Sequence, residues 1–235
     1  MPRPLRIHLP DLIYHVLNRG NNRQVVFAEE KDYLHYLEIL KKYKLKFNFK
    51  IFAYCLMANH IHLVIKTSKQ GTISDIMKAV TIAHTRYYHH KYHASGHIWQ
   101  GRFKSPIVSD DEYLLTLMRY IEQNPLRAGM VEQPDKYPFS SCKANTKIQK
   151  DSLVDKEDNP VYLSLGNTIE ERTRQYMEFV LRPLEDKQLE LIRKSLGGLS
   201  HFASEKFQAQ INRLLLAKQK RQRGRPRRSN LSITN

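Results

Sequence analysis

Hydrophobic and polar residues follow two different periods along the first half of the chain. Residues 12–19 (LIYHVLNR) alternate between apolar and polar, as in a half-buried strand. Two apolar runs, residues 49–57 and 61–66, are separated only by residues 58–60 and therefore predict a hairpin. Apolar residues recur at helical spacing in three longer segments, residues 29–47, 72–93 and 109–129.

The order of these elements predicts an α+β fold. With a short strand at the end of the glycine-punctuated segment 96–108, the order is β-α-β-β-α-β-α. This order is typical of a ferredoxin-like antiparallel sheet with helices on one face. Local signals place the helix ends: Thr72 or Ser74 begins the second helix, Ser109 caps the third, and Pro125 ends or kinks it.

The pattern changes after Ser141. The following residues are polar and aperiodic, and helical spacing then returns in residues 170–181, 185–196 and 204–216. The last residues are too charged to pack and are predicted to be disordered. We therefore expect four regions: an α+β domain at residues 1–144, a linker at 145–164, a helical DNA-binding or docking region at 165–216 and a basic tail at 217–235.

Charge indicates a polyanionic partner. The chain has 39 Lys and Arg against 23 Asp and Glu, a net charge of +16 that favours nucleic acid. A membrane is not expected as a partner, because no apolar run approaches the ~18 residues of a membrane span. The first ten residues have no apolar core of a secretory signal, and Cys55 and Cys142 form no disulfide framework. We expect a cytoplasmic, nucleoid-associated protein with reduced thiols.

Two histidines one residue apart interrupt the apolar run of the hairpin. Side chains of a strand alternate between its faces, so His60 and His62 share one side. Two imidazoles on a rigid strand can form half of a metal site, and they can equally lie on a solvated face.

Tyr120 and Asn124 are a candidate second half of such a site. They lie four residues apart on the third predicted helix and so share a face. A phenol there can attack a phosphorus atom while the amide oxygen completes a metal shell. The alternative is that Tyr120 is a core aromatic residue and Asn124 merely precedes Pro125 at the helix end.

Four stretches of the chain resemble the signature blocks of a known family. They are YHVLNRGNNRQVVF, AYCLMANHIHLVI, GHIWQGRFKS and LMRYIEQNPLRAG. In this order they resemble the REP-associated tyrosine transposases, single-tyrosine members of the HUH single-strand endonucleases, over about residues 10–141. The resemblance implies a catalytic domain in which His60 and His62 bind a divalent metal and Tyr120 is the nucleophile. Asn124 stands where relatives carry a third polar metal ligand, which is often Gln.

The resemblance implies cleavage and strand transfer on single-stranded hairpin DNA of the REP type. Mg²⁺ or Mn²⁺ would polarise the scissile phosphate, and attack by Tyr120 would give a 5′-phosphotyrosine intermediate. Two alternatives stay open: a non-cutting hairpin-DNA-binding protein derived from a transposase, and an RNA-binding protein. The sequence is compatible with a monomer and with a homodimer.

A second group of tyrosines and histidines competes for the catalytic role. Tyr88 and Tyr92 have a spacing that some HUH replication enzymes use, and His89 and His93 share a helical face. All four lie in the basic aromatic segment RYYHHKYH, which we interpret as a packing or DNA-contacting surface.

Cations, amides and aromatic residues near the signature blocks are candidate DNA contacts, because cations bind phosphates and aromatic rings stack on unpaired bases. They are Arg19, Asn21, Arg23, Arg102, Phe103, Lys104 and Arg127. The tail sequence RGRPRR resembles an AT-hook, which predicts that Arg223, Arg225 and Arg227 enter the minor groove of A/T-rich duplex DNA. A generic basic tail is the alternative.

Overall fold

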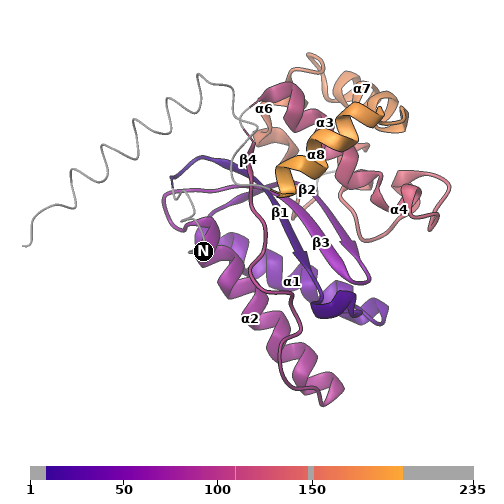
Figure 1. Cartoon of the computed structure of the whole chain (residues 1–235). Coiled ribbons are helices and arrows are strands. Elements are labelled where there is room, and N and C mark those ends of the chain that lie inside the picture. The colour runs from indigo at the N-terminus through magenta and orange to yellow at the C-terminus, as the bar shows by residue number, and fades with distance from the viewer. Residues whose placement is uncertain (1–8, 109, 148–150, 198–235) are drawn as a thin grey trace, which may run out of the picture. The chain divides into compact units, whose positions relative to one another are not determined.

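A computed structural model describes residues 9–108, 110–147 and 151–197. The strands of these residues form one antiparallel sheet (Figure 1). The strand order is β2-β3-β1-β4, and all neighbours are antiparallel. The strands are β1 (Ile13–Arg19), β2 (Lys50–Met57), β3 (His60–Lys66) and β4 (Ile107–Val108). The helices are α1 (Glu30–Phe47), α2 (Ile73–Tyr92), α3 (Asp111–Glu122), α4 (Asn124–Arg127), α5 (Cys142–Asn145), α6 (Pro160–Leu163), α7 (Ile169–Leu181) and α8 (Asp186–Gly197), with short 3₁₀ turns η1 (Asn21–Arg23), η2 (Pro134–Lys136) and η3 (Lys156–Asp158). The predicted ferredoxin-like α+β fold is confirmed. The expectation that the helices lie on one face of the sheet is wrong, because α3 packs against the face opposite α1 and α2.

The two faces of the sheet carry different side chains. Residues that are paired across antiparallel strands point to the same face, and His62 is paired with Leu17 and with Cys55. That face therefore carries His62, and Cys55 belongs to a core that includes residues of α3. Ile61 points to the opposite face, which α1 and α2 cover in Figure 1.

Side-chain caps fix the helix starts. Thr72 and Asp75 form a capping box at α2, as one of the two predicted starts requires. At α3 the N-cap is Asp110 rather than the expected Ser109, because the Asp110 carboxylate accepts the backbone N–H of Tyr113. The third predicted helix ends at Glu122. Pro125 lies in the first turn of the short helix α4, where a proline is tolerated.

The second half of the chain packs against α3. Tyr162 in α6 and Tyr176 in α7 are buried in the same core as Tyr120. Glu122 fixes this packing: its carboxylate accepts hydrogen bonds from Ser141 Oγ (2.6 Å), Asn145 Nδ2 (2.7 Å) and Tyr176 Oη (2.8 Å). Burial raises the pKa of Glu122 to about 7.

The segment expected as a linker is packed where the structure describes it. It contains η3 and α6, and Val161 and Tyr162 are 5% and 1% exposed. In the described residues, the α+β region and the helices that follow it are thus not separated by an exposed connection, and their division into domains stays a prediction. The segment 204–216 and the tail with Arg223, Arg225 and Arg227 lie outside the described residues.

Candidate active site

Three histidines meet on one face of the sheet. His60 and His62 come from β3, and His15 from the neighbouring strand β1 lies beside His62. His15 Nε2 is 2.9 Å from His62 Nδ1, and the two rings are stacked at 5.2 Å. His60 Nδ1 is 2.6 Å from Oδ1 of Asn59 in the hairpin turn. Hydrogen bonds within the described residues thus engage the Nδ1 atom of each β3 histidine.

Burial keeps these histidines neutral. It lowers the pKa of His60 to about 4, with a further contribution from the charge of Arg19. Burial also lowers the pKa of His15 to about 3 and holds the pKa of His62 well below its ordinary value. A neutral imidazole has one N–H and one lone pair, so each ring can act as a ligand at neutral pH.

The hydrogen bonds indicate where the lone pairs lie. The carboxamide oxygen of Asn59 can only accept, so His60 donates its Nδ1–H and presents the lone pair of Nε2. The bond between His15 and His62 carries one proton. When that proton is on His62 Nδ1, His62 also presents the lone pair of Nε2.

Tyr120 packs beside the histidines from α3. Its ring lies edge-on to His62 at 5.7 Å and to His15 at 6.4 Å, and its side chain is buried. The guanidinium of the exposed Arg127 lies over the ring, 4.2 Å from its centroid. We call His15, His60, His62, Tyr120 and Arg127 the histidine site.

Asn124 forms its hydrogen bonds at the end of α3, as the second of the two sequence interpretations expects, and its role as a metal ligand stays a prediction. Its Oδ1 accepts from Arg127 Nη2 at 3.0 Å, and its Nδ2 donates to the carbonyls of Tyr120 and Ile121. The amide therefore closes the end of α3 and fixes Arg127 over Tyr120. As a metal ligand, Asn124 would first have to release Arg127.

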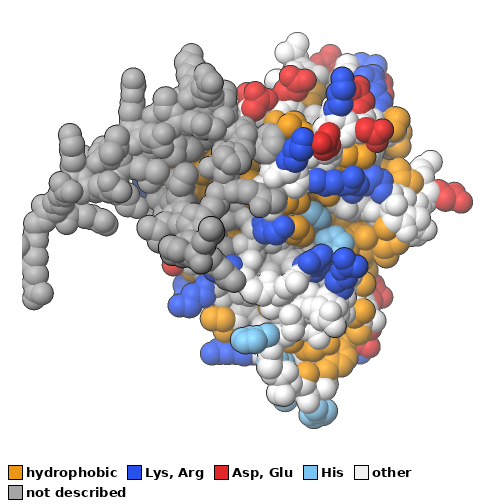
Figure 2. Space-filling model, in the orientation of Figure 1, with side chains coloured by type: hydrophobic (Ala, Val, Ile, Leu, Met, Phe, Trp, Pro, Cys, Tyr) orange, Lys and Arg blue, Asp and Glu red, His pale blue; other side chains and the backbone are white. Residues whose placement is uncertain are grey.

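The other predicted DNA contacts lie at the edge of this face and beyond it. Arg19 is paired with His60 across the strands, and its guanidinium donates twice to Gln100 Oε1 at 2.9 and 2.6 Å. Asn21 and Arg23 are exposed in η1. Arg102, Phe103 and Lys104 follow Gln100 along the edge of β1. Figure 2 shows histidine side chains among Lys and Arg side chains on this surface.

The competing tyrosines of α2 are used in packing. Tyr92 Oη donates to Asp32 at 2.7 Å, and Tyr88 Oη donates to the carbonyl of Val25 at 3.2 Å. These bonds join α2 to α1 and to the segment before it.

His15 is the site residue that sequence reasoning missed. The alternating pattern of residues 12–19 places His15 at a polar position, which predicts a solvent-exposed side chain. The signal in the sequence is a histidine between the two apolar residues Tyr14 and Val16, which the structure shows to be buried. Only the pairing of β1 with β3 places it against His62.

The described residues contain no group of three or more His, Cys, Asp or Glu side chains that could hold a metal ion. The donor set that does fit a metal is therefore small. It consists of the two Nε2 atoms of His60 and His62, to which oxygen ligands would have to be added.

The family of IS200-like transposases matches residues 8–124, a stretch that holds every residue of the histidine site except Arg127. These residues belong to that family. Within the described residues of this IS200-like protein, none of the helices combines the length and the apolar composition that a membrane span requires.

The predicted resemblance to REP-associated tyrosine transposases is confirmed. A Haemophilus influenzae protein assigned as a REP-associated tyrosine transposase is 29% identical over 116 residues, a match that covers 43% of this chain and 63% of that protein. A solved REP-associated tyrosine transposase bound to a REP hairpin shares the fold, with a TM-score of 0.52 and 18% identity over 66% of this chain and 98% of that chain. A Deinococcus radiodurans protein assigned as a transposase is 22% identical over 52% of this chain and 97% of that chain, with a TM-score of 0.37.

Proposed function

We propose that this IS200-like transposase cuts and rejoins single-stranded DNA next to a hairpin, with Tyr120 as the nucleophile. The observation that carries the proposal is the contact of the Tyr120 ring with His62, 5.7 Å between centroids, beside a second neutral histidine on the same strand. Family membership and the REP hairpin bound to a structural relative support hairpin DNA as the partner.

A divalent metal fits this arrangement through the histidines. His60 and His62 are neutral, and their hydrogen bonds through Nδ1 leave Nε2 of each ring for a ligand. A bound Mg²⁺ or Mn²⁺ supplies Lewis-acid polarisation of the scissile phosphate. Imidazole ligands suit Mn²⁺ better than Mg²⁺, which prefers oxygen donors.

The covalent step exchanges one phosphodiester for another. Tyr120 Oη forms a bond to the scissile phosphorus, and the bond from phosphorus to the 3′-oxygen of the upstream nucleotide breaks. The phenolic proton passes to water, and the departing 3′-oxygen takes up a proton to become a 3′-OH. The downstream strand stays attached to Tyr120 through its 5′-phosphate. Attack by another 3′-OH reverses these bond changes and joins that strand without a nucleotide cofactor.

Cations around Tyr120 hold the phosphate in this proposal. Arg127 is exposed and lies over the nucleophile's ring, so its guanidinium can take a phosphate oxygen in place of Asn124. This exchange frees Asn124 Oδ1, which would then be available as a third metal ligand beside His60 and His62. Arg19 stands beside His60 at the edge of the sheet and binds the next phosphate.

The experiment compares tyrosine variants on one labelled substrate. The full chain is incubated with hairpin DNA that carries a single-stranded extension, with Mn²⁺, and the covalent adduct is resolved on a denaturing gel. Wild type, Tyr88→Phe and Tyr92→Phe are expected to form the adduct, and Tyr120→Phe is not. An adduct that persists in Tyr120→Phe overturns the assignment.

Matched substrates separate the alternative functions. Duplex DNA and RNA of the same sequence are expected to give no adduct. Tight hairpin binding by wild type without any adduct would instead indicate the non-cutting DNA-binding protein. Preferential binding of the RNA would indicate the RNA-binding protein.

A further inference from the structure

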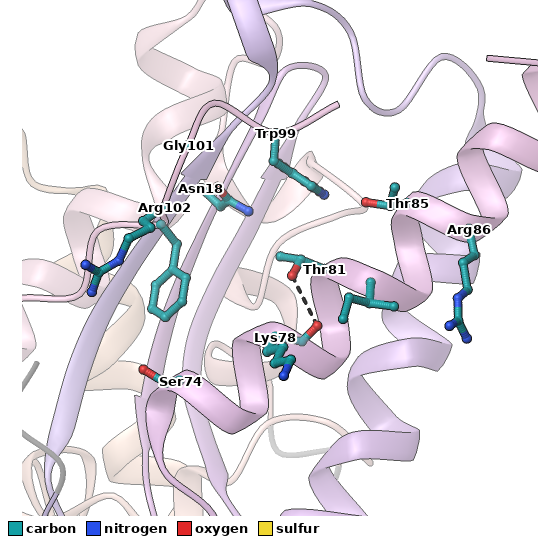
Figure 3. A pocket seen from close by; sticks show the side chains of 11 residues that line it. Asn18, Ser74, Lys78, Thr81, Thr85, Arg86, Trp99, Gly101 and Arg102 are labelled. Atoms are coloured by element: carbon teal, nitrogen blue, oxygen red, sulfur yellow. Dashed lines mark hydrogen bonds between the residues drawn. The ribbon is translucent and has the colours of Figure 1, made fainter. Parts of the chain in front are cut away.

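A pocket of about 600 Å³ lies on the face of the sheet opposite the histidines (Figure 3). Asn18 of β1 borders it from the sheet, because Asn18 is paired with Ile61 and points away from the face of His62. Thr81 and Thr85 border it from α2, and Trp99 borders it from the segment that crosses the edge of β1. We call this space the α2 pocket.

Two polar groups at the α2 pocket have no partner within the part of the chain that the structure describes. Asn18 is 3% exposed, and its Oδ1 forms no hydrogen bond. Trp99 is 8% exposed, and its Nε1–H forms none either. Buried polar atoms of folded proteins are nearly always paired, so an acceptor and a donor beside one pocket indicate a ligand that pairs them.

The other residues that line the pocket indicate the chemistry of that ligand. The exposed side chain of Ile82 (42%), together with Trp99 and Phe103, provides apolar and aromatic walls. The exposed cations Lys78, Arg86 and Arg102 also line the pocket. A flat ring with hydrogen-bonding edges, attached to phosphates, satisfies both parts of the lining, and an unpaired nucleotide in a DNA strand has this chemistry.

The α2 pocket and the histidine site share one segment of chain. Gln100 binds Arg19, which is beside His60, whereas Trp99 and Phe103 on either side of Gln100 line the pocket. This segment is held along β1 by the backbone bonds of Gln100 to Arg19 and of Lys104 to Leu17. A single strand that crosses this edge of the sheet can therefore reach both places.

We propose that the α2 pocket binds one unpaired nucleobase of the DNA strand that is processed at the histidine site, which rests on the proposed function for its substrate. Asn18 Oδ1 and Trp99 Nε1–H pair with the edge of the base, and Phe103 packs against its ring. A carboxamide pairs best with adenine, which presents one donor and one acceptor together, so adenine is the expected base. The pocket would thus select the sequence next to the hairpin.

The test couples a missing base to a pocket variant. Hairpin DNA with a single-stranded extension is prepared with an abasic site at each unpaired position in turn. Its affinity for the full chain is measured by fluorescence anisotropy in a Tyr120→Phe background, which prevents cleavage. One abasic position is expected to weaken binding about tenfold in the otherwise unchanged chain. The same position has little effect in Asn18→Leu or Ile82→Trp.

These variants have matched controls. Ile82→Trp blocks the pocket from an exposed position and changes no buried side chain, so it keeps the test informative if Asn18→Leu does not fold. Leu45→Trp makes the same change at a side chain of α1 that is 84% exposed, and it should respond to the abasic site as the unchanged chain does. If no abasic position loses its effect in the pocket variants, the proposal is wrong.

The abasic-site test of the pocket and the adduct test of the proposed function can fail independently of each other. Adduct formation at Tyr120 without any coupled abasic position rejects the α2 pocket and keeps the nuclease. A coupled position without any adduct keeps the pocket and rejects the nuclease. Among substituted bases at the coupled position, adenine is expected to bind most tightly, and equal affinity for all four bases would reject the role of Asn18.

Discussion

Two of the places where a tyrosine meets a cation differ in their hydrogen bonds. In the first place, which we call the Asp32 cluster (Asp32, Tyr87, Lys91 and Tyr92), one buried carboxylate accepts bonds from all three neighbours. Burial alone would raise the pKa of Asp32, but the hydrogen bonds, that of Lys91 first, hold it well below the usual range. The cluster joins α1 to α2.

In the histidine site, several polar atoms keep free bonding positions within the described part of the chain. The hydrogen bonds of His60 and His62 engage Nδ1, His15 Nδ1 has no partner in the described residues, and Arg127 stays exposed over Tyr120. The difference separates a cluster whose bonds stabilise the fold from a site that keeps its bonding capacity for a ligand. Both contain a tyrosine on a helix and a nearby cation, so residue types alone do not distinguish them.

The largest expected effect comes from removing the cation of each place. Lys91→Met leaves the buried carboxylate of Asp32 without its charge partner and should lower the free energy of unfolding by about 3–5 kcal/mol. Arg127→Met changes an exposed side chain, so the free energy of unfolding should stay within about 0.5 kcal/mol of wild type. Urea denaturation measures both values.

The rate of adduct formation should depend on the two variants in the opposite way from stability: Arg127→Met should lower it and Lys91→Met should not. Below its melting temperature, Lys91→Met should form the Tyr120 adduct as wild type does, whereas Arg127→Met should form it more slowly. Slow adduct formation in a fully folded Lys91→Met, or a normal rate in Arg127→Met, would contradict the comparison.

A second effect tests His15, which we place as a positioning residue for His62. His15→Leu removes the partner of His62 Nδ1 and should weaken Mn²⁺ binding by about 10–100-fold. The readout is Mn²⁺ titration by electron paramagnetic resonance, and ¹⁵N NMR reports the tautomer of His62. His15→Gln, which can still accept a hydrogen bond, should restore part of the affinity.

His84→Leu is the matched control for His15→Leu. His84 is as fully buried as His15, and neither of its ring nitrogens has a partner in the described part of the chain. It packs against Tyr36 and Trp99 in the layer of α1 and α2. Equal losses of Mn²⁺ affinity in His15→Leu and His84→Leu would show that His15 acts only through general stability.

The fold was accessible from sequence because it follows from local patterns. Periods of two and of 3.6 residues located β1 to β3 and α1 to α3, and their order is enough to predict the sheet. The packing of the segment around Tyr162 was not predicted, because its few apolar residues lie among charged ones and show no helical or strand period. Tertiary contacts with α3 and α7, rather than a local pattern, hold it in place.

The site was accessible only in part. A spacing of two in a strand places His60 and His62 together, and family resemblance indicated Tyr120. The bond between His15 and His62 joins residues 47 positions apart, and its geometry depends on a register that periodicity does not encode. Asn124 was assigned to a ligand position, although an amide at a helix end also finds the free carbonyls there.

Per pH unit, the smallest expected effect is the pH dependence of stability that comes from the buried histidines, of which His84 near Asp32 is the clearest case. Burial lowers the pKa of His84 to about 3, although the charge of Asp32 opposes this shift. Between its ordinary value of 6.5 and about 3, the unfolded chain binds a proton at His84 that the folded chain refuses. The free energy of unfolding should therefore fall as the pH drops through this range, by at most about 1.4 kcal/mol per pH unit for each such histidine. His84→Leu should flatten this slope in urea titrations between pH 7 and 4, while the adjacent Tyr36→Phe, which removes no group that titrates there, should keep it. An unchanged slope in His84→Leu would mean that His84 charges equally in the folded and unfolded chains, and that its burial does not set the acid limit of the fold.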